Sequence, residues 1–584
     1  MPQTPTEHVD LEAFKTAVAW PNPTVDSFTN LVNRYNAAGL HGEAAGYFAE
    51  REAATRGSEA HPWMLAAAGL FEALDAGSVP LLRRRGAVRE AVAKLDDAVA
   101  EETGLSRYLR GVVLVNLPSS FEETERGVED LNWVIANQES FPPGIVRAAW
   151  RELSKGYTAL GDEARAADAL AISGHAATTH EGTFSTPSSV RAQEGFRFGI
   201  PRVLELGSGI YQVESHDFGD IGFIETDEGF VAIDAGTFPE NAAAALEAVQ
   251  GFADAPVHTV VLTHGHWDHI GGVSAFTDAG ATVVTQADFE ASVEAISRFE
   301  PPPFSWFFGQ QSVNLDVTPD VVIGELRSLG TSRLINLVPV RGGETEDALL
   351  IHVPDAGVVF VGDAFMPFLG APFTEEGNPV ALLDTIDTIV SLEPTRIVHG
   401  HPPLTELWTI EVLPDLRNAL AQLIDATTVS IASGRTLAES LRDNVLPESL
   451  REAPKAVLPY ITMREGVIKR LYDNSTGYWQ ADREGLETLA LEDWSRALDL
   501  LGGNERSYVR AVEALLEGGE GALPLRLADI GLVSYPESTK LADLRKQALQ
   551  RLRSVHHVSN PFKFIVYSET VGDELAPFMA AEPL

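Results

Sequence analysis

Residues 258–272 read HTVVLTHGHWDHIGG and place three histidines and an aspartate directly after a run of apolar and β-branched residues. The run TVVLT is typical of a buried strand, and the glycines that follow it allow a tight loop. His264, His266, Asp268 and His269 offer four potential metal ligands within six residues. Imidazole and carboxylate groups at this spacing suit zinc, iron or manganese. The stretch therefore predicts a metal site on a loop at the end of a strand.

Short runs of β-branched residues surround this stretch from about residue 200 to residue 405. They include GFVAIDAG at 229–236 and ATVVTQ at 281–286, each with glycine or aspartate at its boundary. Two segments between them, 239–252 and 288–299, have the three- and four-residue apolar spacing of helices. This alternation predicts an α/β domain that carries the metal loop.

Both flanks of this region have helical patterns. Residues 1 to 190 form one predicted helical domain, and residues 410 to 584 form another. Residues 146–170 resemble a tetratricopeptide helix pair with its turn at Gly161, and residues 31–48 resemble it more faintly. The two turns are not separated by a multiple of the roughly 34 residues of that repeat. Two interpretations of the first domain stay open, a platform for a partner protein and a helical cover for the catalytic domain.

The composition limits the function classes. The 584 residues carry 43 Lys and Arg against 84 Asp and Glu, a net charge of −41, and no cysteine. Such a negative field disfavours nucleic acid and anionic membranes as partners. Without cysteine there are no disulfides, thiolate metal sites or cysteine nucleophiles. The first residues lack the pattern of a signal peptide, and apolar runs are too short to span a membrane, so we expect a cytoplasmic protein.

The pattern H-x-H-x-D-H after a strand resembles the signature of the metallo-β-lactamase fold, a four-layer αββα sandwich. The resemblance covers residues 200 to 405 and implies roles for three further residues. In GFVAIDAG, Asp234 is expected to brace the metal loop. In FVGDAF (360–365), Asp363 is expected to bridge two metals, and in RIVHGHPPL (396–404), His401 is expected to bind the second metal.

Glu344, in RGGETEDALLIHVPD (341–355), stands where most of the superfamily has a histidine. A glutamate there resembles the alkyl sulfatase branch, whose bridging carboxylate follows 19 residues later, as Asp363 follows Glu344. Glu344 could also be a solvated turn residue. His352 lies within the predicted strand LLIHV and is interpreted as structural.

The resemblance to alkyl sulfatases continues beyond the α/β domain. LRDNVLPESL (441–450), REGVIKRLYDNSTGYW (464–479) and residues 502–538 are similar to the helical dimerisation domain of that family. The resemblance implies a homodimer, and it divides the chain into a helical domain at 1–190, a catalytic domain at 200–405 and a dimerisation domain at 410–584.

The resemblance implies a complete ligand set for two metals. His264, His266 and Glu344 are expected on the first metal, and Asp268, His269 and His401 on the second, with Asp363 between them. Asp268 and Asp363 would be catalytic as well as ligating. Two divalent ions, most simply zinc with iron or manganese as alternatives, can activate a bridging hydroxide. The implied reaction is hydrolysis of an ester-type small molecule, with sulfate esters as the family's substrates.

Two further segments concern the substrate. Alkyl sulfatases have an arginine that faces the sulfate in an L-R-G-A segment, whereas FLGAPF (368–373) places Leu369 there. Arg341 could replace that arginine or could be a surface residue. The loop PPPFSWFFGQQ (301–311) contributes Phe304, Trp306 and Phe307, either to an apolar substrate wall or to a loop packed on the core.

Two other classes of function compete with hydrolysis. Four histidines and three carboxylates form a hard ligand set, so a diiron oxygenase acting on a small or carrier-bound substrate is the alternative. The N-terminal helices would then recruit a protein partner. A silent binding module is disfavoured because all seven ligand-type residues are present.

Overall fold

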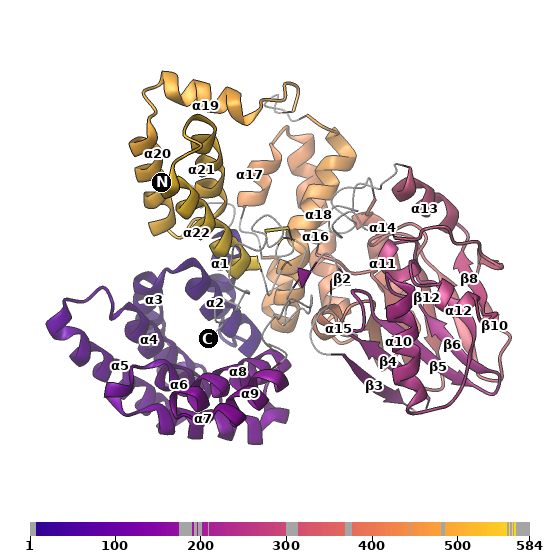
Figure 1. Ribbon diagram of the computed structural model, residues 1–584, viewed down its shortest axis with the longest axis horizontal. Coiled ribbons are helices and arrows are strands. Elements are labelled where there is room, and N and C mark those ends of the chain that lie inside the picture. Colours follow the sequence, from indigo (N-terminus) through magenta and orange to yellow (C-terminus); the bar gives the residue numbers. More distant parts are fainter. Residues whose placement is uncertain are drawn as a thin grey trace. The chain divides into compact units, whose positions relative to one another are not determined.

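The computed structural model (Figure 1) describes most of the chain. The described residues are 8–173, 190–191, 195–196, 201–207, 209–298, 313–367, 376–443, 446–479, 485–556, 560, 563 and 566–567. Contacts between residues divide the chain into two compact units. One unit contains residues 178–488 and 559–569, and the other contains residues 7–177 and 489–558.

A seven-stranded sheet carries the metal loop of the first unit. Its strand order follows the sequence from β3 to β9. The strands from β3 to β6 pair antiparallel, and those from β6 to β9 pair parallel. The strands are β3 (Arg202–Gly207), β4 (Ile210–Glu214), β5 (Ile221–Thr226), β6 (Gly229–Ile233), β7 (Val257–Val261), β8 (Thr282–Gln286) and β9 (Val321–Ile323).

A second sheet has five strands, again in sequence order. Its strands pair antiparallel except for β13 and β14, which are parallel. They are β10 (Arg327–Leu329), β11 (Ile335–Pro339), β12 (Leu349–Val353), β13 (Val358–Gly362) and β14 (Arg396–His399). A short antiparallel pair, β1 (Val190–Arg191) with β2 (Gly195–Phe196), precedes the two sheets.

The alternation of side chains along each strand builds the layers. In β6, Phe230 and Ala232 belong to an apolar cluster with Ala242 and Ala245 of helix α10 (Pro239–Gln250). Val231 and Ile233 of the same strand belong to a second cluster, which contains residues of both sheets. Successive residues of a strand point to opposite faces, so one face meets a helix and the other meets the second sheet. Figure 1 shows α10 beside β4, and the helix contacts β3, β4 and β5.

Helices complete the outer layers of this sandwich. On the side of the second sheet, Thr385 of helix α14 (Pro379–Ser391) donates to the backbone carbonyl of Arg341, 2.8 Å away, just after β11. The predicted αββα sandwich with helical flanks is therefore confirmed. Its other helices are α11 (Trp267–Ile270), α12 (Ser274–Thr277), α13 (Phe289–Ser297) and α15 (Pro402–Leu407).

Three C-terminal helices belong to the same unit as the sandwich. Helix α14 packs against α16 (Leu413–Ala432) and α18 (Val457–Thr476), and α17 (Leu437–Arg442) packs against α18. Contacts thus group α16 to α18 with the sandwich, whereas the next four helices belong to the other unit. The three-domain division of the chain stays a prediction.

All of the regular secondary structure described in the other unit is helical. The predicted helix pair at 146–170 is α8 and α9, with Gly161 at φ 79° in the turn, and the fainter pair at 31–48 is α2 and α3. Its helices are α1 (Val9–Val18), α2 (Val25–Ala38), α3 (His41–Ala54), α4 (His61–Asp75), α5 (Leu81–Glu101), α6 (Leu105–Asn116), α7 (Thr124–Ala136), α8 (Pro143–Ala159), α9 (Glu163–Ile172), α19 (Leu491–Leu500), α20 (Glu505–Glu517), α21 (Ala522–Ser534) and α22 (Thr539–His556).

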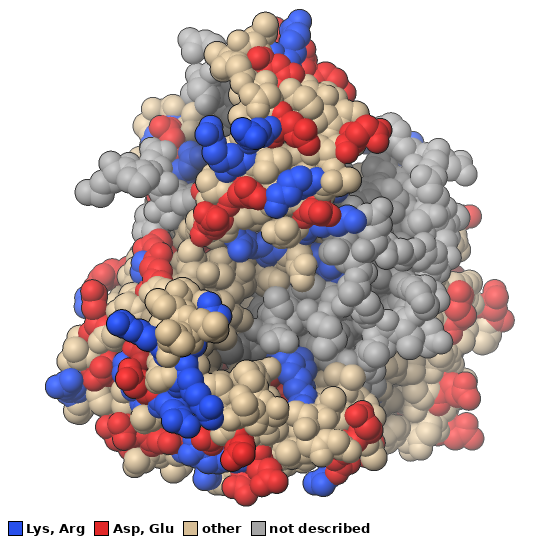
Figure 2. Space-filling model, turned by 60° about the vertical axis from the view of Figure 1, so that its left-hand side comes forward, with Lys and Arg blue, Asp and Glu red and all other residues tan. Residues whose placement is uncertain are grey.

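The described surface carries both signs of charge despite the large net negative charge. Figure 2 shows basic and acidic side chains interspersed over one face. None of the described helices combines the length and the apolar character that a membrane span requires.

Candidate metal centre

The first group of potential ligands consists of His264, His266 and Glu344. Glu344 Oε2 lies 3.3 Å from His264 Nε2 and 3.4 Å from His266 Nδ1. All three side chains are buried, and one ligand atom from each lies within 4.8 Å of the others. The loop between β11 and β12 therefore brings Glu344 to the histidines that follow β7.

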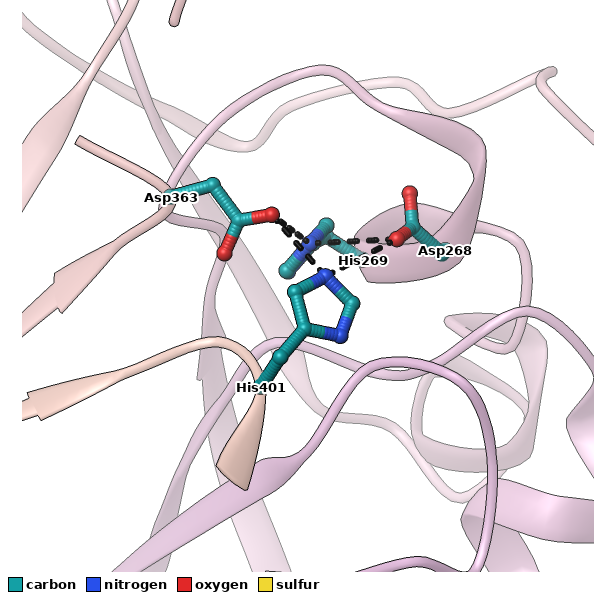
Figure 3. Close-up of side chains that lie close together, drawn as sticks. All are labelled: Asp268, His269, Asp363 and His401. Carbon is teal, nitrogen blue, oxygen red and sulfur yellow. Dashed lines mark ion pairs between the residues drawn. The ribbon is translucent and has the colours of Figure 1, made fainter. Parts of the chain in front are cut away.

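The second group consists of Asp268, His269, Asp363 and His401, which Figure 3 shows converging from separate segments. His401 Nε2 lies 2.9 Å from Asp363 Oδ2 and 3.3 Å from Asp268 Oδ2. His269 Nε2 lies 3.4 Å from Asp363 Oδ2 and 3.5 Å from Asp268 Oδ2. The two groups adjoin, since the ring centroids of His264 and His269 are 4.2 Å apart. The bridging role of Asp363 stays a prediction because its carboxylate is grouped here with the second set.

The ends of strands position both groups. The histidine loop follows β7, Asp363 follows β13, and His401 follows β14. Asp234, directly after β6, accepts hydrogen bonds from Thr263 N at 2.7 Å and from Thr263 Oγ1 at 2.8 Å. Its second oxygen also lies 2.8 Å from His269 Nδ1. Asp234 has a φ of 63°, a conformation that aspartate tolerates better than most residues. These contacts hold the metal loop, which supports the bracing role expected of Asp234.

The chemistry of the donors fits divalent metal ions. Several of the converging atoms are buried and have no hydrogen-bond partner among the described residues, and native structures rarely leave such atoms unpaired. These atoms are His264 Nε2, His269 Nε2, Glu344 Oε2, Asp268 Oδ1 and Asp363 Oδ1. Nitrogen and carboxylate oxygen donors of this kind are the ligands of zinc, iron and manganese. The residues present therefore fit two metal ions, one for each group.

The electrostatics of the second group couple its histidines and carboxylates. Burial alone would raise the pKa of Asp268 and Asp363, but His269 and His401 outweigh it. The pKa of Asp268 falls to about 2, and the pKa of Asp363 falls well below its usual range. Burial disfavours the charged form of His269 and His401, yet the carboxylates raise the pKa of both well above the ordinary value. Without metal, the site thus holds protons that a metal ion would displace.

Partners outside the two groups orient the imidazole rings. His401 Nδ1 lies 2.8 Å from the backbone carbonyl of Phe218, which leaves Nε2 to face the carboxylates. On the first side, His266 Nε2 lies 2.8 Å from Glu376 Oε1, which leaves Nδ1 to face Glu344. Such outer partners fix the tautomer of a ligating histidine. Sequence reasoning missed both contacts, since neither a backbone carbonyl nor a lone glutamate before α14 carries a recognisable pattern.

Arg470 of α18 is a further residue that the sequence did not single out in this region. Its side chain is buried, and burial lowers the pKa of its guanidinium, while Glu376, Asp473 and Glu344 favour its charged form. Helix α18 also reaches the segment before α14, because Asn474 Nδ2 lies 3.5 Å from the carbonyl of Gly377. The C-terminal helices therefore bring a positive charge toward the first group.

We expect Glu376→Ala to weaken metal binding at the first group by about 10- to 100-fold, the usual cost of losing an outer partner. Glu376→Gln keeps an acceptor for His266 and should retain most of that affinity. Competition with a chromophoric chelator measures the two binding constants separately. Equal weakening at both groups, or equal losses in the alanine and glutamine variants, would argue against this role of Glu376.

The remaining predicted residues lie away from the groups or outside the described residues. Arg341 is an exposed side chain whose guanidinium pairs with Asp288, so its predicted substrate contact gains no support from its position. His352 lies within β12, as expected of a structural residue. The substrate predictions for Phe304, Trp306, Phe307 and Leu369 fall outside the described residues.

Comparisons with known proteins bear on the class of this protein. Residues 216–401 match the family described as the metallo-beta-lactamase superfamily. A linear primary-alkylsulfatase from a Pseudomonas species is 23% identical over 338 residues, which cover 50% of this chain and 63% of that relative. A hydroxyacylglutathione hydrolase from Rhodobacter capsulatus is 30% identical over 146 residues, which cover 25% of this chain and 48% of that relative. The chain thus spans less than two thirds of the length of either relative.

The comparison with a solved structure supports the same fold. A stereoselective inverting sec-alkylsulfatase from Pseudomonas superposes with a TM-score of 0.51 at 18% identity, over 63% of this chain and 64% of that chain. Together with the site, these similarities define a protein of the metallo-β-lactamase fold that carries a candidate metal centre. Within that class the chain is alkyl sulfatase-like, which confirms the resemblance stated from its motifs. The diiron oxygenase alternative receives no support from these relatives.

Proposed function

We propose that the protein is a dinuclear metal-dependent hydrolase that cleaves an ester-type bond in a small molecule with an apolar body. The observation that carries this proposal is the convergence of seven buried ligand-type side chains into two adjoining groups. Two divalent ions, most simply zinc, would supply a water molecule of lowered pKa and would offset negative charge on the attacked group. The alkyl sulfatase-like relatives support hydrolysis as the reaction.

In this proposal the ligand residues and the residues that surround them have different roles. His264, His266 and Glu344 hold the first ion, and the second group holds the other. Asp268 and Asp363 would contribute negative charge to the metal ions and help to fix their positions. Asp234 and Glu376 keep the imidazole rings aligned from outside. The carboxylates of Asp234, Asp268, Glu344 and Asp363 are buried, which excludes bulk water and strengthens each electrostatic contact.

Alkyl sulfates are one candidate substrate class, and Leu369 gives a reason to expect a different preference. An apolar side chain at that place removes one charge-assisted contact, worth about 1.5–3 kcal/mol. We therefore expect slow hydrolysis of dodecyl sulfate and faster hydrolysis of carboxylic esters or lactones with an apolar body. Leu369→Arg should raise the rate on alkyl sulfates by roughly one or two powers of ten.

The experiment compares wild type and Leu369→Arg on a series of alkyl sulfates and on carboxylic esters of matched chain length. An arginine that accelerates sulfate esters alone supports the proposed specificity. Efficient hydrolysis of alkyl sulfates by the wild type, with no gain from the arginine, would contradict this account of Leu369 while leaving the hydrolase proposal in place.

We also propose that the protein forms a homodimer through its C-terminal helices. In support, α19 and its neighbours expose large apolar side chains, and Leu500 and Leu501 are 83% and 84% exposed. Light scattering at micromolar concentration should give twice the chain mass. The variant Leu500→Glu with Leu501→Glu should be monomeric, whereas Leu326→Glu, at an exposed position of the sandwich, should remain dimeric. A monomeric wild type would contradict the proposal.

A further inference from the structure

A cavity of about 560 Å³ lies within the helical unit that contains the N-terminal helices, and the metal-dependent reaction gives it no role. Most of its walls come from α4, α5 and α6 and from the segment that follows α6, and Asn36 of α2 and Glu152 of α8 also line it. The volume falls in the range of about 300–1,000 Å³ that small-molecule sites occupy. The cavity is therefore large enough for a ligand of its own.

The walls of this cavity are mostly apolar. Leu70, Val88, Val112 and Val113 line it and are themselves buried by neighbouring helices, so the apolar surface is preformed. Leu81 also lines the cavity and is 77% exposed. Such a lining favours the body of an alkyl chain, because every methylene group transferred from water into it is stabilised.

Two arginines of α5 also line the cavity. Arg84 donates to the carbonyls of Val79 at 2.9 Å and Gly77 at 2.6 Å, and Arg85 donates to the carbonyl of Ser120 at 3.2 Å. The Arg85 guanidinium also lies over the ring of Phe121, 5.7 Å from its centroid. The hydrogen bonds of both arginines go to backbone carbonyls and not to carboxylates among the described residues, although the chain carries a net charge of −41. Two cations fixed by backbone carbonyls suit a single anionic head group.

The carboxylate of Glu152 also lines the cavity but does not neutralise the positive charge of Arg84 and Arg85. Glu152 is buried and already compensated, because Arg151 Nε lies 3.2 Å and Lys155 Nζ lies 3.1 Å from its Oε1 atom. Asn116 donates to its other oxygen at 2.8 Å. The uncompensated charge around the cavity is therefore positive.

We propose that this cavity binds a linear alkyl anion, with its chain between α4, α5 and α6 and its head group at Arg84 and Arg85. The site is distinct from the metal centre because all of its lining residues belong to the other unit. It gives the N-terminal helices a ligand-binding role that does not depend on hydrolysis. A carboxylate or a sulfate can provide the head group, since either accepts paired hydrogen bonds from an arginine.

Calorimetric titration of the full-length, metal-loaded protein with octanoate, decanoate and dodecanoate tests the proposal, each below its micelle concentration. Affinity should rise about three- to fourfold per added methylene until the cavity is full. Replacing both arginines, Arg84→Gln with Arg85→Gln, should weaken decanoate binding by about tenfold or more. Arg83→Gln is the matched control, because Arg83 is exposed on the same turn of α5 and does not line the cavity.

A second variant, Ala73→Phe, places a ring at a lining position of α4 and should abolish binding while the far-ultraviolet circular dichroism stays unchanged. The same titration with decyl sulfate and with decanol compares a second anionic head group and an uncharged head group with decanoate. Binding of both anions and weak binding of the alcohol support recognition of the charge, and binding of decanoate alone restricts the site to carboxylates. Unchanged decanoate affinity in the double arginine variant and in Ala73→Phe would place the ligand elsewhere and overturn the proposal, as would no binding at all.

Discussion

The Asp268→Ala variant is expected to lose ester hydrolysis by about three powers of ten, since one catalytic metal ion contributes several kcal/mol to the transition state. It should also bind one metal ion per chain in place of two. The physical reason is the position of Asp268, whose Oδ2 atom lies 3.3 Å from His401 Nε2 and 3.5 Å from His269 Nε2. Removing this carboxylate takes an anionic ligand from the second group, so His269 and His401 lose one of their two carboxylate neighbours.

Asp278→Ala provides the matched control for this variant. Asp278 follows α12, ten residues beyond Asp268, and its side chain is exposed. The control should keep both metal ions and full activity. Elemental analysis and initial rates, measured on the same preparations, give the comparison. An Asp268→Ala protein that retains two metal ions or normal turnover would show that the second group is not a metal site.

A second large effect is expected in the pH dependence of metal binding. Burial alone would lower the pKa of His266, His269 and His401, but neighbouring carboxylates raise each pKa well above the ordinary value. In the metal-free protein the carboxylates therefore favour the protonated form of these histidines. A metal ion binds the neutral imidazole, so metal binding must release these protons. Affinity should fall as the pH decreases, by about tenfold per pH unit for each proton released.

Chelator competition between pH 6 and pH 8 measures this slope, and calorimetry in buffers of different ionisation enthalpy counts the protons released. An unperturbed histidine, with a pKa of about 6.5, would lose its effect above neutrality. The raised values predict that the slope continues above pH 7. A metal affinity that is constant over this range, with no proton release, would contradict the coupling between the histidines and the carboxylates.

The sequence predicts the part of the site that is local. His264, His266, Asp268 and His269 stand within six residues after a strand, so this one loop is enough to indicate a metal site. Glu344, Asp363 and His401 are far apart in the chain, and each is unremarkable by itself. Their place in the site could be expected from resemblance to a known fold, because sheet topology rather than sequence spacing brings the ends of β7, β13 and β14 together.

Other features could not be predicted for physical reasons. Glu376 and Arg470 act through tertiary contacts, and neither stands in a pattern that distinguishes it from a surface charge. Arg341, a candidate substrate contact by its position next to Gly342 and Gly343, pairs with Asp288, a partner that no local pattern identifies. The grouping of α16 to α18 with the sandwich likewise depends on packing between helices, which apolar stripes alone do not specify.

The most direct test of the central claim is a metal titration of the metal-free protein, followed by the rate of ester hydrolysis. We expect no activity without metal and a rate that reaches its plateau at two equivalents of zinc per chain. Equal hydrolysis by the metal-free protein, or no hydrolysis of any ester or sulfate at two bound zinc ions, would contradict a dinuclear metal-dependent hydrolase.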